Sequence, residues 1–119
     1  MNAGELERAL YDAKREVDAA LEEYNRAIRE DAEADKQAKI SHASAYLASS
    51  GTAGERSAYA DKGSVDERYR ARLAEGLKRS AASAVESKRQ WLSALQSLAS
   101  LTKAEAQLAK WGPEGGDGP

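Results

Sequence analysis

Residues 65–111 read VDERYRARLAEGLKRSAASAVESKRQWLSALQSLASLTKAEAQLAKW, and Gly76 is the only Gly or Pro among them. One Gly costs a helix roughly 1 kcal/mol relative to Ala, which a helix of this length can absorb. Gly112 and Pro113 follow, as is typical of a helix end, with Lys110 in the last turn. The stretch therefore predicts one long helix over residues 65–111.

The preceding sequence predicts two more helices. No Gly or Pro lies between Gly4 and Gly51, so we expect a first helix over residues 3–48. Loop signals at residues 49–52 and 61–63 leave a short helix over residues 53–60. Three pairs of a small polar residue with Glu three positions later predict capping boxes at the helix starts. They are Asn2 with Glu5, Thr52 with Glu55, and Ser64 with Glu67.

The composition limits the classes of protein. The chain has 119 residues, of which 25 are Ala and only 16 are Leu, Ile or Val, so a thick globular core is not expected. Residues that favour strands are scarce and nowhere alternate, which nearly excludes a sheet. The absence of Cys excludes disulfides and thiol catalysis and fits a reducing compartment. No apolar run approaches ~18 residues, so we expect no membrane partner and a cytoplasmic location.

The apolar residues of each long helix fall on one stripe when they are placed at about 100° per residue. Such an amphipathic helix needs a partner helix to cover the stripe. In the first helix the stripe contains Ala3, Leu6, Leu10, Ala13, Val17, Leu21, Tyr24, Ile28, Asp35, His42 and Tyr46. In the last it contains Tyr69, Leu73, Leu77, Ala84, Trp91, Leu95, Leu98, Thr102, Ala106 and Ala109.

Charge supports pairing of these two helices. Residues 1–48 contain seven Lys or Arg and eleven Asp or Glu, whereas residues 64–111 contain nine and five. Opposite net charges help to select the partner and its orientation. We therefore expect an all-α fold: a long antiparallel, coiled-coil-like helical hairpin with a short helix in the connecting loop. It forms a single domain over residues 1–111, followed by a flexible acidic tail over residues 112–119.

Four polar residues are candidates for a functional cluster. Asp31, Asp35 and His42 lie on or near the first stripe, and Arg70 is expected opposite them. A carboxylate and imidazole cluster can bind a metal or transfer protons. Arg70 disfavours a cation, however, and the sequence has neither an HExxH motif nor a second His. The preferred interpretation is a polar layer that sets the register of the helices.

A row of arginines is a candidate contact for nucleic acid or another partner. Arg68, Arg72 and Arg79 share the outward face of the last helix, and such a row can follow a phosphate backbone. Arg56 is a further candidate, or it pairs with an acidic residue beside the loop. Interspersed Glu residues and a pI near 5.5 favour instead a solvated, salt-bridged face.

The end of the last helix is apolar on more than one side. Leu101, Leu108 and Trp111 lie on a second row, and Tyr11 near the same end falls off its own stripe. A helix that is apolar on several sides is usually surrounded. We expect these residues to mediate self-association into a helical bundle, with a dimer favoured. The alternatives are a foreign protein partner and scattered apolar surface residues.

The sequence contains none of the usual catalytic signatures. A phosphate-binding Gly loop, a nucleophile elbow, zinc-ligand spacing and a cofactor box are all missing. A pair of helices also lacks the concave pocket that enzymes normally need. We therefore expect a protein that is not an enzyme and has no cofactor or metal.

Residues 55–60 (ERSAYA) and 97–105 (SLASLTKAE) resemble segments of small helical proteins of tailed bacteriophages. In those proteins a Tyr- or Phe-Leu-rich helix end, here Tyr46-Leu47, leads through a Gly-Thr or Gly-Ser loop into Glu-Arg. The resemblance covers residues 44–106. It implies an early phage gene product, often encoded near DNA recombination or single-strand annealing functions and located in the bacterial host cytoplasm. It carries no catalytic residues to this chain.

Together these features predict a non-enzymatic helical interaction protein. We expect it to self-associate and to bind a macromolecular partner, as an accessory to DNA recombination or replication. The alternative is a small phage inhibitor that binds and blocks a host defence or regulatory protein.

Overall fold

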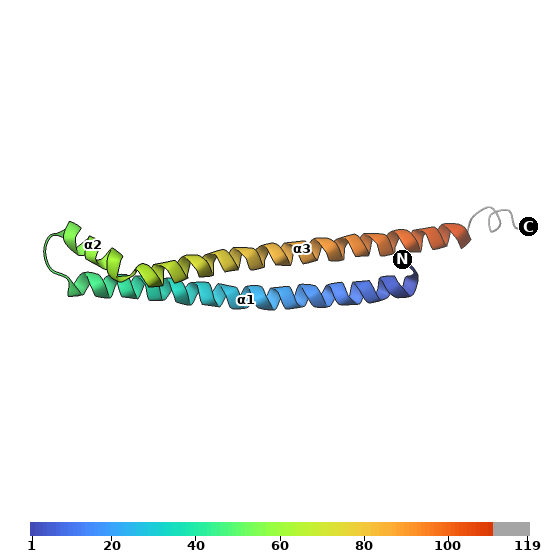
Figure 1. Cartoon of the computed structure of the whole chain (residues 1–119). Helices are drawn as coiled ribbons and strands as arrows, with labels where there is room; N and C mark the ends of the chain where they lie inside the picture. The colour runs from blue at the N-terminus through green and yellow to red at the C-terminus, as the bar shows by residue number, and fades with distance from the viewer. Residues whose placement is uncertain (111–119) are drawn as a thin grey trace, which may run out of the picture. The chain divides into compact units, whose positions relative to one another are not determined.

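The computed structural model describes residues 1–110, which form three α-helices in that range (Figure 1). Helix α1 spans Ala3–Ala48, α2 spans Ala53–Gly63 and α3 spans Val65–Lys110. The bounds of α1 and the start of α3 agree with the prediction, whereas α2 continues three residues past the predicted end. Trp111 and the predicted tail lie outside the described residues. None of the three described helices is long and apolar enough to cross a membrane.

Two of the predicted capping boxes begin helices as expected. The Glu5 backbone N–H donates to Asn2 Oδ1 at 2.8 Å, and the Asn2 amide donates back to Glu5 Oε1 at 3.0 Å. At the start of α2, the Glu55 N–H donates to Thr52 Oγ1 at 3.2 Å. Just before it, Gly51 turns the chain with φ of 107°, a backbone conformation that a residue with a side chain rarely adopts.

Ser64 joins α2 to α3, and its predicted capping box with Glu67 is wrong. Ser64 is fully buried, and its hydroxyl instead donates to the Ala60 carbonyl at 2.7 Å. Its backbone N–H donates to the same carbonyl at 3.1 Å. The neighbouring Gly63 lies so close to α1 that an added Cβ would be 3.1 Å from the Ala45 Cβ. The end of α2 therefore packs closely against α1 at Gly63, where there is little room for a side chain.

The chain divides into two compact units, each of which contains parts of α1 and α3. The hairpin unit is Ala20–Ala84 and includes all of α2. The terminal unit combines Met1–Ala19 with the chain from Val85 onward.

In each unit, residues that come later in α1 contact residues that come earlier in the part of the chain after α1. In the terminal unit, Leu95 packs against Leu6 and Ala13, and the later Glu16 lies 3.4 Å from the earlier Lys88 (Oε2 to Nζ). In the hairpin unit, Asp31 pairs with Lys78, and the later His42 contacts the earlier Asp61. The helices are therefore antiparallel, and the predicted all-α helical hairpin is confirmed.

Both long helices bury a heptad seam, which we call the inner seam. Its residues are buried or half-buried and alternate spacings of three and four, which average the 3.5-residue period of a coiled coil. On α1 they are Leu6, Leu10, Ala13, Val17, Ala20, Tyr24, Ala27, Asp31, Ala34, Ala38, Ser41 and Ala45. After the junction residue Ser64, they are on α3 Glu67, Ala71, Ala74, Lys78, Ala81, Val85, Lys88, Leu92, Leu95 and Ala99.

Alanine dominates the inner seam of the hairpin unit. Ala27 and Ala38 of α1 are buried, and Ala71, Ala74 and Ala81 of α3 are half-buried. Short side chains allow two helices to approach closely but bury little apolar area, and apolar burial is the main favourable contribution to folding. The larger apolar residues of the inner seam lie in the terminal unit, where a core cluster forms around Leu95.

The predicted stripe of α3 is correct at Leu95, which is buried against Leu6 and Ala13 of α1, but most of its other large residues do not face α1. Tyr69, Leu73, Leu77 and Trp91 are all more than half exposed, at 68, 53, 55 and 51 %. The prediction assigned the buried stripe to the largest apolar side chains. The structure buries a seam of smaller residues on another side of the same helix.

The predicted stripe of α1 is correct at its start and drifts later. It follows the inner seam closely as far as Tyr24, but Ile28 and Asp35 are exposed, and Ala27 and Ala34 take the buried positions. A 3.6-residue period drifts by about 20° per heptad from the 3.5-residue period that the structure uses. Over the length of α1 this drift moves the predicted stripe off the interface.

The tight contact at the end of α2 generates a prediction. Ala60 is fully buried, whereas Ala58 on the same helix is exposed. Ala60→Leu should lower the free energy of unfolding by about 1–3 kcal/mol, because the added side chain overpacks the site. The control Ala58→Leu should change it by no more than about 0.5 kcal/mol. Urea unfolding followed by far-UV circular dichroism measures both, and equal effects would contradict the close packing.

Candidate interaction surface

Helix α3 carries a second heptad seam, which we call the outer seam. Its nine positions also alternate spacings of four and three over four heptads, and all are exposed. Each one except the last directly precedes a residue of the inner seam, so the two seams are about 100° apart around the helix. The outer seam consists of Leu73, Leu77, Ser80, Ala84, Ser87, Trp91, Ala94, Leu98 and Leu101.

The face around the outer seam has no charged residue over more than 30 positions of the chain. The exposed residues along the edge of the outer seam that lies away from the inner seam are also small or uncharged: Gly76, Ser83, Gln90, Ser97 and Ala104. Charged residues make up 32 % of the chain, so a face of this length without charge is a distinct surface. Surfaces depleted of charge and enriched in large apolar side chains are typical of protein interfaces.

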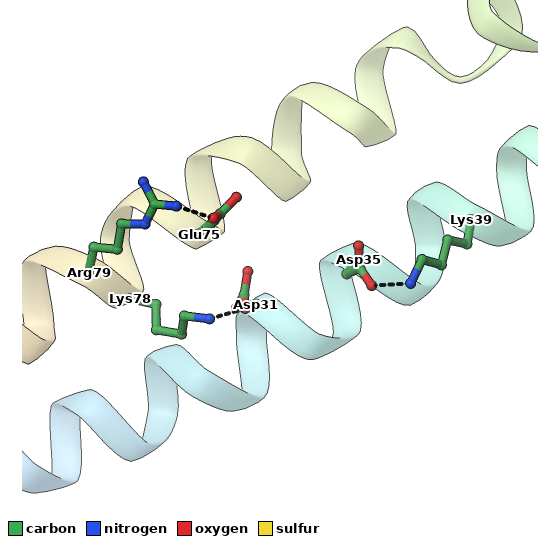
Figure 2. A network of polar contacts seen from close by, with 6 residues as sticks. All are labelled: Asp31, Asp35, Lys39, Glu75, Lys78 and Arg79. Carbon is green, nitrogen blue, oxygen red and sulfur yellow. Dashed lines mark hydrogen bonds and ion pairs between the residues drawn. The ribbon is translucent and has the colours of Figure 1, made fainter.

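An ion pair crosses the inner seam of the hairpin unit (Figure 2). Lys78 Nζ donates to Asp31 Oδ2 at 2.8 Å, and both side chains are largely shielded, at 34 and 20 % exposed. The other pairs in the view, Lys39 with Asp35 and Arg79 with Glu75, each lie within one helix. Sequence reasoning missed Lys78 because a lysine does not mark a buried stripe, although it falls on the 3.5-residue period.

The pair affects the titration of Lys78. The hydrogen bond from Lys78 to Asp31 and the negative charge of Asp31 raise the pKa of Lys78 above its ordinary value of 10.5. A raised pKa means that the folded state favours the charged lysine. The contribution of this group to stability is therefore complete below about pH 10.5 and is lost as the pH rises through the higher folded-state pKa.

The other members of the predicted polar layer lie apart from this pair. Asp35 is exposed and pairs with Lys39 one turn along α1 at 2.9 Å. His42 Nε2 lies 3.0 Å from Asp61 Oδ1, so it joins α1 to α2. Arg70 is exposed. The structure thus brings only Asp31 of the four into a cross-helix layer with α3, and the partner there is Lys78.

An open groove beside this pair carries charges of both signs. Its lining includes Asp35, His42 and Asp61 together with Arg68 and Arg72. Within residues 1–110 no group of three His, Asp or Glu side chains is placed to hold a metal ion.

Arg56 stabilises the turn between α1 and α2. Its Nη2 donates to the Tyr46 carbonyl at 3.2 Å, and its guanidinium lies 4.5 Å from the centre of the Tyr46 ring. The last turn of α1 contains no basic residue of its own. Arg56 therefore supplies the positive charge that favours the carbonyl end of a helix. The expected acidic partner beside the loop is replaced by this carbonyl and ring.

The predicted arginine row has unequal contacts. Arg68 Nη2 donates to the Asp61 carbonyl at 2.6 Å and so supports the junction between α2 and α3. Arg79 pairs with Glu75 at 2.5 Å, as expected for a salt-bridged face. Arg72 is exposed and lies in the wall of the groove. Contact between this row and a partner stays a prediction.

The residues predicted to mediate self-association are at the surface. Tyr11, Leu101 and Leu108 are 62, 56 and 71 % exposed, so the hairpin does not cover them. Leu101 is also the last residue of the outer seam. Trp111 lies outside the described residues. Self-association itself stays a prediction.

The cross-seam ion pair generates a second prediction. Lys78→Met should lower the urea midpoint, because it leaves the shielded Asp31 carboxylate without its partner. The double change Lys78→Met with Asp31→Leu should restore the midpoint, since two apolar side chains replace the pair. Lys39→Met, which removes the exposed pair within α1, should leave the midpoint unchanged. A midpoint that falls as much for Lys39→Met as for Lys78→Met would contradict the special role of the cross-seam pair.

Comparison of the chain with protein-family models, with curated proteins and with solved structures finds no match. Interpretation of its surfaces therefore depends on the contacts and exposure of its own residues.

Proposed function

We propose that this chain is a non-enzymatic helical interaction protein that self-associates and binds a macromolecular partner. The observation that carries the proposal is the outer seam of α3: a regular heptad of exposed residues on an uncharged face. The hairpin needs only the inner seam to pair its own helices. A second seam with coiled-coil spacing is typical of a helix that packs against a further helix.

Covering a leucine of the outer seam gains more free energy of apolar burial than covering an alanine of the inner seam. Full burial of one Leu side chain is worth about 1.5–3 kcal/mol, so covering a half-exposed Leu gains roughly half of that. Leu73, Leu77, Leu98 and Leu101 are each between 40 and 56 % exposed, and Trp91 adds a large aromatic side chain. Aromatic and large apolar residues of this kind contribute most of the energy at protein interfaces.

The resemblance to small phage proteins supports a more specific form of the proposal, an accessory role in DNA recombination or replication. Arg72 and Arg79 lie beside the uncharged face; Arg79 is paired with Glu75, so Arg72 is the better placed of the two to contact phosphate groups, through contacts that depend on salt. Arg56 and Arg68 already hold backbone carbonyls, so we assign them a weaker part in such binding. The alternative is that the chain binds and inhibits a host defence or regulatory protein.

Self-association can be tested at the outer seam. At high micromolar concentration the wild-type chain should sediment with at least twice its mass of 12.8 kDa. The double change Leu73→Glu with Leu77→Glu should give a helical monomer, because it places charge on the seam without touching the inner seam. The matched control is Ile40→Glu with Leu47→Glu, which changes two exposed apolar residues of α1 and should remain associated. A wild-type monomer at that concentration would refute self-association.

Binding of nucleic acid can be tested separately by filter retention of single- and double-stranded DNA at low salt. Retention should fall steeply as salt increases, and Arg72→Gln should reduce it further, because each phosphate contact releases counterions. Arg29→Gln changes an exposed arginine of α1 and serves as the control. If the wild-type chain retains neither form of DNA, the accessory role is wrong, and a protein captured from nuclease-treated host lysate then favours the inhibitor.

A further inference from the structure

Helices α2 and α3 are separated by a single residue, Ser64, which belongs to neither. Its φ of −116° and ψ of 14° differ by about 55° each from the values of a regular α-helix. Backbone hydrogen bonds of helical spacing still meet at this residue: the Ser64 N–H donates to the Ala60 carbonyl, and the Arg68 N–H donates to the Ser64 carbonyl at 2.9 Å. Rotation at this one residue would therefore join α2 to α3 as a continuous helix.

Two side chains hold the interruption in place. In a continuous helix the Val65 N–H would donate to the Asp61 carbonyl. Here Arg68 Nη2 donates to that carbonyl at 2.6 Å, and Ser64 Oγ donates to the Ala60 carbonyl at 2.7 Å. A side chain that inserts into the series of backbone bonds is an established cause of a sharp helix kink. Ser64 and Arg68 thus keep α2 bent away from the line of α3 (Figure 1).

Helix α2 is held on α1 by few contacts. Ala60 is the only buried residue among its eleven, and the rest are half-buried or exposed. Its end approaches α1 at Gly63, and the exposed His42–Asp61 contact joins the two helices at 3.0 Å. A segment that buries so little apolar area opens at a lower cost in free energy than the core does.

The folded-back position of α2 also leaves two donors unsatisfied. Arg56 and Arg68 each donate to a backbone carbonyl through Nη2. Their Nε atoms, however, are shielded from solvent and have no hydrogen-bond partner among residues 1–110. A shielded donor without a partner costs free energy that a solvated donor does not. Lifting α2 off α1 would return both guanidinium groups to water.

The loop before α2 is long enough for such a movement. Gly63 of α2 lies against Ala45 of α1. Beyond this level, α2 in line with α3 would extend about 15 Å to Ala53, whereas α1 extends about 4.5 Å to Ala48. With helix axes about 8–10 Å apart, the two loop ends would be about 13–15 Å from each other. The five Cα–Cα steps between them reach about 16–18 Å, so α1 need not change.

We propose that α2 is a strap hinged at Ser64. In the closed state it lies on the end of α1 and holds Arg56 and Arg68 against backbone carbonyls. In the open state it continues α3 as one helix and releases both arginines. The sequence indicated these two residues for contact with a partner, and the closed strap withholds them. A partner that binds them only in the open state would shift the population toward that state.

Distances between spin labels test the hinge, because the wild-type chain has no Cys that would also take a label. The pair Lys36→Cys with Ser57→Cys places labels at exposed positions of α1 and α2. Adding Ser64→Ala with Arg68→Met should populate a second, longer distance at least roughly tenfold more, because a hydrogen bond from a charged donor is lost. Arg70→Met, which changes a nearby exposed arginine of α3, should leave the distances unchanged.

Gly63→Ala is an independent test of the same hinge. Its added Cβ would crowd the Ala45 Cβ in the closed state, and Ala favours a continuous helix over Gly. This variant should also populate the longer distance. The pair Lys36→Cys with Ser83→Cys spans α1 and α3 within the hairpin unit and should keep its distance in every variant, because the strap opens without parting the hairpin.

Three outcomes would overturn the strap. If Gly63→Ala and the double variant Ser64→Ala with Arg68→Met both keep the wild-type distances, the junction is rigid. If the distance between labels at residues 36 and 83 lengthens as well, the whole hairpin opens. If far-UV circular dichroism shows a loss of helix, α2 unfolds instead of joining α3. Dilution with unlabelled chain removes distances between copies, so each outcome holds whether or not the chain self-associates.

Discussion

The close approach of two helices across alanine is the constraint on which the rest of this structure depends. Ala27 and Ala38 are buried on the inner seam of α1, and Ala71, Ala74 and Ala81 are half-buried on that of α3. Small side chains let two helices approach closely, whereas Leu6, Leu92 and Leu95 fill the inner seam of the terminal unit. In the hairpin unit, the leucines of α3 lie on its outer surface instead, with Leu73 and Leu77 more than half exposed.

Much of the fold could be predicted because local signals agreed with one another. The uninterrupted stretches without Gly or Pro gave α1 and α3, and the polar starts at Asn2 and Thr52 gave their predicted contacts. Which face is buried could not be predicted from apolarity. Leu77 outranks Lys78 on any hydrophobicity scale, yet Lys78 lies on the inner seam because its long chain reaches Asp31 while Leu77 stays outside.

Some residues of the candidate site could also be predicted from the sequence, and others could not. Exposed apolar residues at the end of α3 were predictable, since the first helix can cover only one side of it. The role of Arg56 at the end of α1 was not, because its target is a carbonyl of Tyr46 that no residue pattern marks. His42 likewise contacts α2 rather than α3, since the short helix packs against α1 at this point. Contacts that depend on the exact path of a connection are the ones that sequence patterns locate least well.

The two seams of α3 are offset by one residue along the sequence, which places them about 100° apart around the helix. Turning α3 through about 100° would present Leu73, Leu77 and Trp91 to α1 in place of the alanine strip. Two features oppose that rotation: the buried hydroxyl of Ser64, anchored to Ala60, and the Lys78 ammonium, anchored to Asp31. One residue inserted between Ser64 and Leu73 would move Leu73, Leu77 and Trp91 into the positions of the inner seam and would turn the alanines of that seam away from α1.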